Sequence, residues 1–125
     1  MVIEDDAIIG ADLELCAADL GFKEVLAARD EAGAVAVAES SHPNLIICDL
    51  RLGPEGSGVR AANAILRQGP AAIVFVTGLL PGNELVVDKA GVVTLGKPCD
   101  VIGLKRAINR AVTRPAGSRV QVEIS

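Results

Sequence analysis

The stretch Leu45-Ile46-Ile47-Cys48 is a continuous apolar run that ends at Asp49. A strand that is covered on both faces needs apolar side chains on both sides, so this run predicts a buried strand of a parallel sheet. A second apolar run, Ala72–Val76, predicts another such strand and is followed by Thr77. The middle of the chain therefore predicts two fully buried strands, each with a polar side chain at its carboxyl end.

Strand and helix patterns alternate outward from these two runs. Shorter apolar segments predict three further strands, at Met1–Ile3, Val25–Ala28 and Val92–Leu95. Apolar residues at helical spacing predict helices between the strands, at residues 9–20, Glu31–Ser40, 59–66, Asn83–Lys89 and 101–112, of which the fourth is short or irregular. This alternation predicts an α/β fold in which helices cover both faces of a parallel sheet.

The composition indicates one domain and argues against several classes of protein. The chain has 125 residues, and domains have about 100–200. Two Phe and no Trp or Tyr argue against a surface that stacks nucleic acid bases, and a net charge of −4 argues against binding to a phosphate backbone. No apolar segment is long enough to cross a membrane. Three cysteines without a CxxC pair favour reduced thiols, so we expect a cytoplasmic protein without nucleic acid or membrane partners.

Chemically active side chains follow four of the five predicted strands. Glu4 and Asp5 come after the first strand, Asp49 after the third, Thr77 after the fourth and Lys97 after the fifth. Ligands of open parallel sheets gather at the carboxyl ends of the strands. We therefore expect three carboxylates, a hydroxyl and an ammonium to converge on one edge of the sheet.

This set of groups is suited to one reaction. Carboxylates packed together repel one another unless a cation neutralises them, and ligands that are all oxygens favour Mg²⁺. A carboxylate beside Mg²⁺ can attack phosphorus and form an acyl phosphate. The metal, the hydroxyl and the ammonium then neutralise the charge of the transferred group. The residues therefore predict phosphorylation of an aspartate.

The order Glu4-Asp5, Asp49, Thr77-Gly78 and Lys97-Pro98 resembles the receiver domain of bacterial two-component response regulators. The resemblance covers residues 1–113 and leaves 114–125 as a C-terminal tail. It implies a flavodoxin-like (βα)₅ fold with the strand order 2-1-3-4-5.

The resemblance also implies a partner and a role for each group. Asp49 would accept a phosphoryl group from a histidine kinase or a histidine phosphotransfer protein. Thr77 and Lys97 would contact the phosphoryl oxygens, and the Lys97-Pro98 peptide bond would be cis.

A metal site is implied in the same way. Asp5, Asp49 and the backbone carbonyl of Arg51 would bind Mg²⁺ directly, and Glu4 would act through a metal-bound water.

The chain departs from the usual receiver pattern at several positions. Thr94 stands where most receivers carry an aromatic residue. The sequence Phe75-Val76-Thr77-Gly78 is similar to a Phe-Ala-Thr-Gly-type motif of single-domain regulators, and the loop Gly53–Gly58 is similar to that of general-stress-response receivers. Arg51 and Leu79 flank the path of an attacking water in this family. Arg51 cannot act as a base and Leu79 cannot hydrogen-bond water, so we expect slow hydrolysis of the acyl phosphate.

These residues predict a stand-alone receiver that signals by phosphorelay or by phosphorylation-dependent binding to a downstream protein. Two alternatives remain open. The first is an interaction module that binds partners without phosphorylation. The second is an independent Mg²⁺-dependent phosphatase, for which Asp49-Leu50-Arg51 lacks a second catalytic acid. Each polar group also has a purely structural interpretation, such as a helix entry for Glu4-Asp5 or a turn for Asp49.

Overall fold

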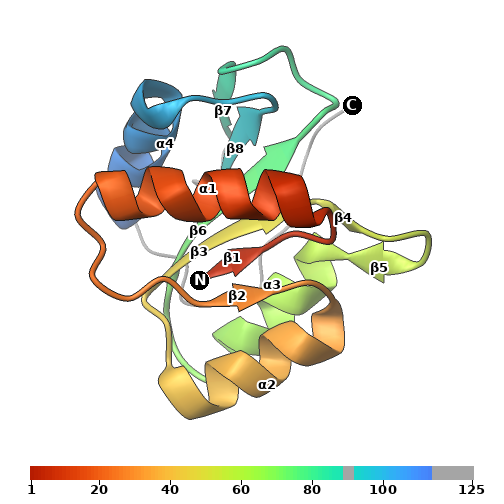
Figure 1. The fold of residues 1–125 in the computed structure, drawn as a ribbon. Coiled ribbons are helices and arrows are strands. Elements are labelled where there is room, and N and C mark those ends of the chain that lie inside the picture. Colours follow the sequence, from red (N-terminus) through yellow and green to blue (C-terminus); the bar gives the residue numbers. More distant parts are fainter. Residues whose placement is uncertain (89–91, 114–125) are drawn as a thin grey trace.

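A six-stranded sheet forms the centre of the computed structural model, which describes residues 1–88 and 92–113. Its strand order is β2-β1-β3-β6-β8-β7 (Figure 1). The strands are β1 (Val2–Ile3), β2 (Ala27–Ala28), β3 (Leu45–Asp49), β6 (Ala72–Thr77), β7 (Leu85–Val87) and β8 (Val93–Gly96). Neighbours are parallel throughout except for β7, which pairs antiparallel with β8. The first five strands in this order confirm the predicted order 2-1-3-4-5.

Helices cover both faces of the sheet, as predicted (Figure 1). The helices are α1 (Ala7–Asp19), α2 (Glu31–Ser41), α3 (Gly58–Leu66) and α4 (Val101–Thr113). Apolar residues of α1 and α4 pack in one core cluster, and those of α2 and α3 pack in a second. Neighbouring strand residues alternate between the two clusters; Ile47 lies in the first and Ile46 in the second. The continuous apolar runs therefore bury side chains on both faces of the sheet.

Aspartate side chains lie at the starts of α1, α2 and α4, and Ser57 caps α3. Asp6 is the N-cap of α1, where one carboxylate oxygen accepts hydrogen bonds from the backbone N–H groups of Ile8 and Ile9 at 2.9 and 3.1 Å. Asp30 caps α2, and Asp100 accepts a hydrogen bond from the Gly103 N–H at 2.8 Å in the first turn of α4. Such caps satisfy N–H groups that have no partner inside the helix.

The predicted fourth helix at Asn83–Lys89 is wrong. Residues 83–88 contain no helix, and Leu85–Val87 forms the edge strand β7 instead. Leu-Val-Val is a short apolar run with two β-branched residues, which favours a strand once β8 offers a partner. Lys89 and the C-terminal tail, including the alternating segment 120–124, lie outside the described residues.

The segment expected to be a loop at Gly53–Gly58 is also more ordered than predicted. It belongs to a small hairpin in which β4 (Arg51–Leu52) pairs antiparallel with β5 (Gly56–Ser57). The hairpin follows Asp49 directly and leads into α3. Among the described residues, no helix is long and apolar enough to cross a membrane.

A close backbone contact at Gly58 predicts that even alanine at this position lowers the stability of the protein. A Cβ at this position would overlap the backbone carbonyl oxygen of Asp49. We expect Gly58→Ala to lower the free energy of unfolding by about 1–3 kcal/mol, the usual cost of overpacking. Urea denaturation followed by far-UV circular dichroism measures this, since the chain has no Trp or Tyr.

Gly10 in α1 provides the matched control. A Cβ there would make ordinary contacts with the Glu4 side chain, the nearest at 3.6 Å, and alanine favours a helix. Gly10→Ala should therefore not lower stability, and an equal loss in both variants would contradict the argument from close contact.

Candidate functional site

The carboxyl ends of four strands meet around an open pocket of about 580 Å³. Asp49 and Thr77 are the last residues of β3 and β6, Glu4 and Asp5 follow β1, and Lys97 follows β8. The pocket is lined by Asp5, Asp49, Leu50, Arg51, Gly53, Pro54, Thr77, Gly78, Leu79 and Lys97. The parallel order of β1, β3, β6 and β8 thus brings these side chains to one edge, as expected from the sequence.

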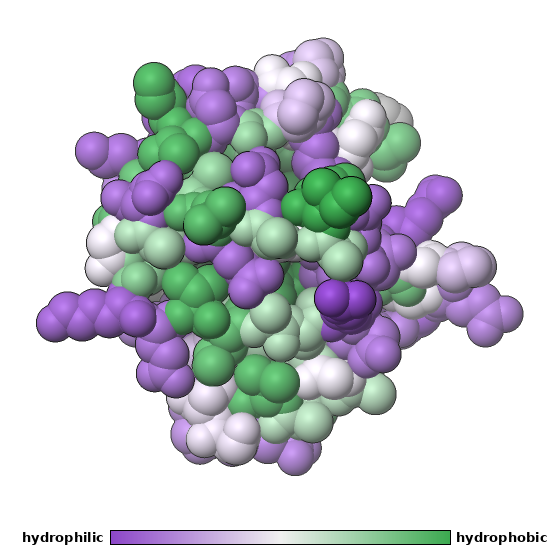
Figure 2. All heavy atoms as spheres, viewed as in Figure 1, coloured by the Kyte–Doolittle hydropathy of each residue, from purple (hydrophilic) through white to green (hydrophobic). Residues whose placement is uncertain are grey.

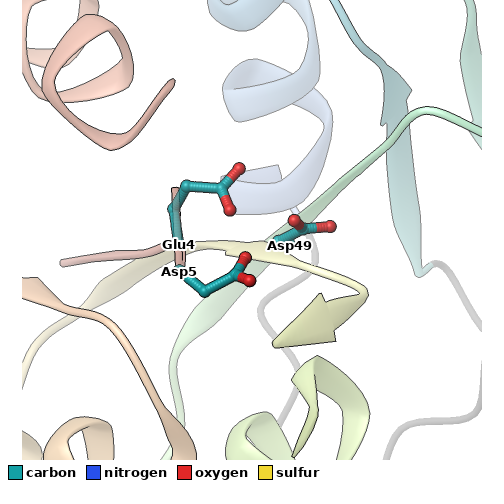
Figure 3. A group of neighbouring side chains, drawn as sticks. All are labelled: Glu4, Asp5 and Asp49. Carbon is teal, nitrogen blue, oxygen red and sulfur yellow. The ribbon is translucent and has the colours of Figure 1, made fainter. Parts of the chain in front are cut away.

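Three carboxylates form the centre of the site. One oxygen each of Glu4, Asp5 and Asp49 lies within 4.8 Å of the other two, and Figure 3 shows their carboxyl groups close together. Glu4 is 2% exposed and Asp49 is 8% exposed, whereas Asp5 is open to solvent. A buried pair and an exposed third carboxylate therefore share one small volume.

Lys97 is the cation of the site. Its Nζ donates hydrogen bonds to Glu4 Oε1 and to Asp49 Oδ2, both at 3.0 Å. Burial lowers the pKa of Lys97, but hydrogen bonds to Asp49 and Glu4 outweigh burial and raise the pKa above its ordinary value. The ammonium therefore stays charged at neutral pH.

Glu4 has the most perturbed carboxyl group of the three. The pKa of Glu4 is raised to about 7, with burial as the largest cause, Lys97 opposing the rise, and the nearby carboxyl groups of Asp49 and Asp5 adding to it. A proton on Glu4 is one way to relieve the charge excess, and a divalent cation is another. Since all the side-chain ligands are oxygens, the residues fit a hard cation.

Thr77 and Arg51 complete the set of predicted site residues. Thr77 is buried, and its Oγ1 accepts a hydrogen bond from the Leu79 N–H at 3.1 Å, which leaves the hydroxyl proton available for donation. The Arg51 N–H donates to Asp49 Oδ1 at 3.3 Å, while the Arg51 side chain is exposed. The Lys97-Pro98 peptide bond is cis, as expected.

The structure places the side chains that the sequence singled out at one edge of the sheet, but part of the pocket wall was not predicted from the sequence. Gly53 and Pro54 line the pocket because the hairpin folds back beside Asp49. Their place in a Gly- and Pro-containing loop directly after Asp49 was a usable signal. Thr94, at the position where receivers usually have an aromatic residue, is 2% exposed.

None of the three cysteines lines the pocket. All three are free, and Cys16 and Cys48 are buried. Burial raises the pKa of the partly exposed Cys99 to about 11, so its thiol stays protonated and weakly nucleophilic at neutral pH.

The pKa of Glu4 predicts that the cation-free protein loses stability as the pH rises. In the unfolded chain this carboxyl titrates near 4.5, whereas in the folded protein it keeps its proton up to about pH 7. Between these values the folded state binds more protons, so the free energy of unfolding falls with increasing pH. Thermal unfolding in EDTA across this pH range, followed by circular dichroism, measures the fall.

Glu4→Gln is the control because it removes the titrating group and keeps the shape. The fall in the free energy of unfolding that Glu4 contributes should be absent in this variant. Adding Mg²⁺ to the wild type should offset this fall. The same pH dependence in both proteins would refute the assignment to Glu4.

Comparisons with known proteins agree with this geometry. The family described as the response regulator receiver domain matches residues 1–109. The phyllosphere-induced regulator PhyR of Methylorubrum extorquens is 36% identical over 78 residues, which are 62% of this chain and 29% of that protein. The transcriptional regulatory protein PdtaR of Mycobacterium tuberculosis is 33% identical over 116 residues, which are 91% of this chain and 56% of that protein.

A solved structure of a PhyR protein is also similar to this chain. The crystal structure of the anti-anti-sigma factor PhyR from Bartonella quintana matches with a TM-score of 0.75 and 30% identity, over 90% of this chain and 46% of that one. This chain spans less than two thirds of the length of each of these three relatives. Because the family match covers nearly all of the described residues, the chain belongs to the response regulator receiver domain family.

Proposed function

We propose that this receiver domain, spanning residues 1–113, accepts a phosphoryl group on Asp49 from a histidine kinase or a histidine phosphotransfer protein in the cytoplasm. The observation that carries the proposal is the Asp49 carboxylate itself. It ends a buried strand, faces an open pocket and lies 3.0 Å from the Lys97 ammonium. A receiver is a signalling domain rather than a classical enzyme, so the phosphorylated protein is the product that matters.

In the proposed reaction an Asp49 carboxylate oxygen attacks the phosphorus of a phosphohistidine. The new O–P bond forms as the N–P bond breaks, and the imidazole leaves with the electron pair of that bond. The Asp49 Oδ2–Lys97 and Oδ1–Arg51 N–H hydrogen bonds hold the carboxylate in place for this attack. Lys97 and the Thr77 hydroxyl then donate hydrogen bonds to the phosphoryl oxygens of the product.

Asp5, Asp49 and the backbone carbonyl of Arg51 would hold Mg²⁺, with Glu4 acting through a water. When bound, Mg²⁺ neutralises charge that accumulates between the carboxylates and the phosphoryl group. The close approach of the three carboxylates and the raised pKa of Glu4 support this assignment.

Exposed apolar side chains on α1 and at the pocket support a protein as the phosphoryl donor. α1 begins two residues after Asp5, and its outer surface carries Ile8 and Leu15, which are 83% and 65% exposed. Figure 2 shows apolar residues on the face that α1 covers in Figure 1. Leu79, 71% exposed, lies at the pocket itself. A donor helix that carries the phosphohistidine could cover these residues while it reaches Asp49.

The names of the relatives support a regulatory output. PhyR of Bartonella quintana is described as an anti-anti-sigma factor, and PdtaR as a transcriptional regulatory protein. By analogy, phosphorylation of this receiver would control its binding to a downstream protein. Binding without phosphorylation is the second candidate, and the small Thr94 in place of an aromatic residue favours it.

Phosphotransfer to Asp49 can be tested directly. Phosphorylated candidate kinases with Mg²⁺ should add one phosphoryl group to the wild type, seen by intact mass spectrometry, and none to Asp49→Ala. Glu39→Ala, which removes an exposed carboxylate from α2 on the other face of the sheet, should accept the group like the wild type. Beryllofluoride, which mimics an acyl phosphate, should bind the wild type. If it does not bind and no kinase donates, the interaction module is the better interpretation.

The residue at position 79 should control the lifetime of the acyl phosphate. Leu79 lines the pocket and cannot orient an attacking water, so the phosphorylated wild type should hydrolyse slowly. Leu79→Glu supplies a group that can accept a proton from water. It should raise the rate of phosphate loss by at most about 100-fold, the lower end for a positioned general base.

Leu79→Ala is the control, because it removes the leucine without adding a carboxylate. Its rate of phosphate loss should stay close to that of the wild type. Phosphate release from purified phosphorylated protein measures all three rates. Rapid loss from the wild type without a phosphatase would contradict the prediction.

A further inference from the structure

The hairpin formed by β4 and β5 is one wall of the phosphoacceptor pocket. Arg51, Gly53 and Pro54 line the pocket, and the Arg51 N–H also donates to Asp49. The hairpin has only two residue pairs, Arg51 with Ser57 and Leu52 with Gly56. Because a two-stranded hairpin of this size is marginally stable in isolation, other parts of the protein must fix its position.

The inner strand β4 is fixed by packing. Leu52 is 5% exposed and belongs to the core cluster of α2 and α3. The Gly58 N–H donates to the Leu50 carbonyl at 2.9 Å, which closes the base of the hairpin. The outer strand β5 has no comparable apolar anchor, since Gly56 and Ser57 are only half-buried.

An ion pair between two helices holds the outer strand and the tip. Glu31, the first residue of α2, accepts hydrogen bonds from Arg60 Nε at 2.9 Å and from an Arg60 terminal nitrogen at 3.0 Å. The same Glu31 carboxylate accepts from the Ser57 N–H at 3.3 Å. The Arg60 guanidinium also donates to the Glu55 carbonyl at 2.5 Å. One bidentate pair therefore contacts the hairpin at two backbone groups, one on each side of Gly56.

Glu31 and Arg60 do this without entering the pocket. Neither residue lines the pocket that contains Asp49, and both line the groove between α2 and α3 instead. The hydrogen bond to Arg60 lowers the pKa of Glu31, so the carboxylate is ionised at neutral pH. The hydrogen bonds of the pair therefore reach the site through the hairpin.

We infer that Glu31 and Arg60 are positioning residues, which hold the hairpin so that its inner strand presents the Arg51 backbone to the cation and phosphoryl site. This inference rests on the proposed function, because it gives the Arg51 backbone a role at that site. Exposed ion pairs contribute little to global stability, so the main effect of this pair falls on the local geometry of the pocket.

The test compares Glu31→Ala, Arg60→Ala and the double variant with the wild type. Isothermal titration calorimetry with Mg²⁺ should show affinity reduced by about tenfold in each single variant, the lower end for residues that orient metal ligands. The double variant should lose no more than either single one, because the two residues act as a unit. Amide hydrogen exchange of Gly56 and Ser57 should be faster in all three variants.

The matched controls lie further along the same helices. Glu39→Ala in α2 and Arg67→Ala, directly after α3, each remove one charged side chain of the same type from the walls of the same groove. They should leave both the Mg²⁺ affinity and the exchange of the hairpin amides unchanged. Thermal unfolding without Mg²⁺ identifies any variant whose reduced Mg²⁺ affinity comes from a loss of global stability.

The outcomes separate this inference from the proposed function. A wild type that binds no Mg²⁺ overturns the proposed metal site, whatever the variants do. A wild type that binds Mg²⁺ while the Glu31 and Arg60 variants bind it equally well overturns the positioning role. An equal loss of Mg²⁺ affinity in the Glu39 and Arg67 controls would also overturn the positioning role, since the effect would then come from the overall charge of the groove.

Discussion

The two hydrogen bonds of the Lys97 ammonium, to Glu4 and to Asp49, join parts of the chain that lie 93 and 48 residues apart. They neutralise two buried carboxylates that would otherwise repel each other at the end of the sheet. One ammonium does not balance three carboxylates, and the pKa of Glu4 is raised mainly by burial and further by the neighbouring carboxyl groups of Asp49 and Asp5. The site thus has a deficit of positive charge, which favours the binding of a divalent cation.

Packing explains how such an unfavourable group of charges is held together. The strands that carry Glu4, Asp49 and Thr77 are buried on both faces, by α1 and α4 on one side and by α2 and α3 on the other. The burial of those strands stabilises the fold independently of the charges at their ends. Sheet geometry then places the polar side chains together, because parallel strands end at the same edge.

The contrast between strands buried on both faces and polar groups at their ends also explains what could be predicted from the sequence. The runs at Leu45–Cys48 and Ala72–Val76 predicted their strands because burial on both faces leaves a strong apolar signal. The positions of Asp49 and Thr77 at the carboxyl ends of these strands followed from the same signal. Residues 85–87 were misjudged because a three-residue segment has no periodicity of its own and becomes a strand through pairing with β8. The contacts of Glu31 with Ser57 and Arg60 were also missed, since 26 and 29 residues separate these groups and no local pattern links them.

The small side chain at Thr94 limits how a change at Asp49 can reach the surface. The chain has two phenylalanines and no other aromatic residue, and Phe75 is fully buried in the core cluster of α2 and α3. Thr94 offers no ring that could turn between a buried and an exposed position. The Thr77 hydroxyl, however, accepts the Leu79 N–H. If Thr77 turns toward a phosphoryl group on Asp49, this hydrogen bond must move or break. Leu79, which donates this hydrogen bond and is 71% exposed, is then a surface residue that such a turn would affect directly.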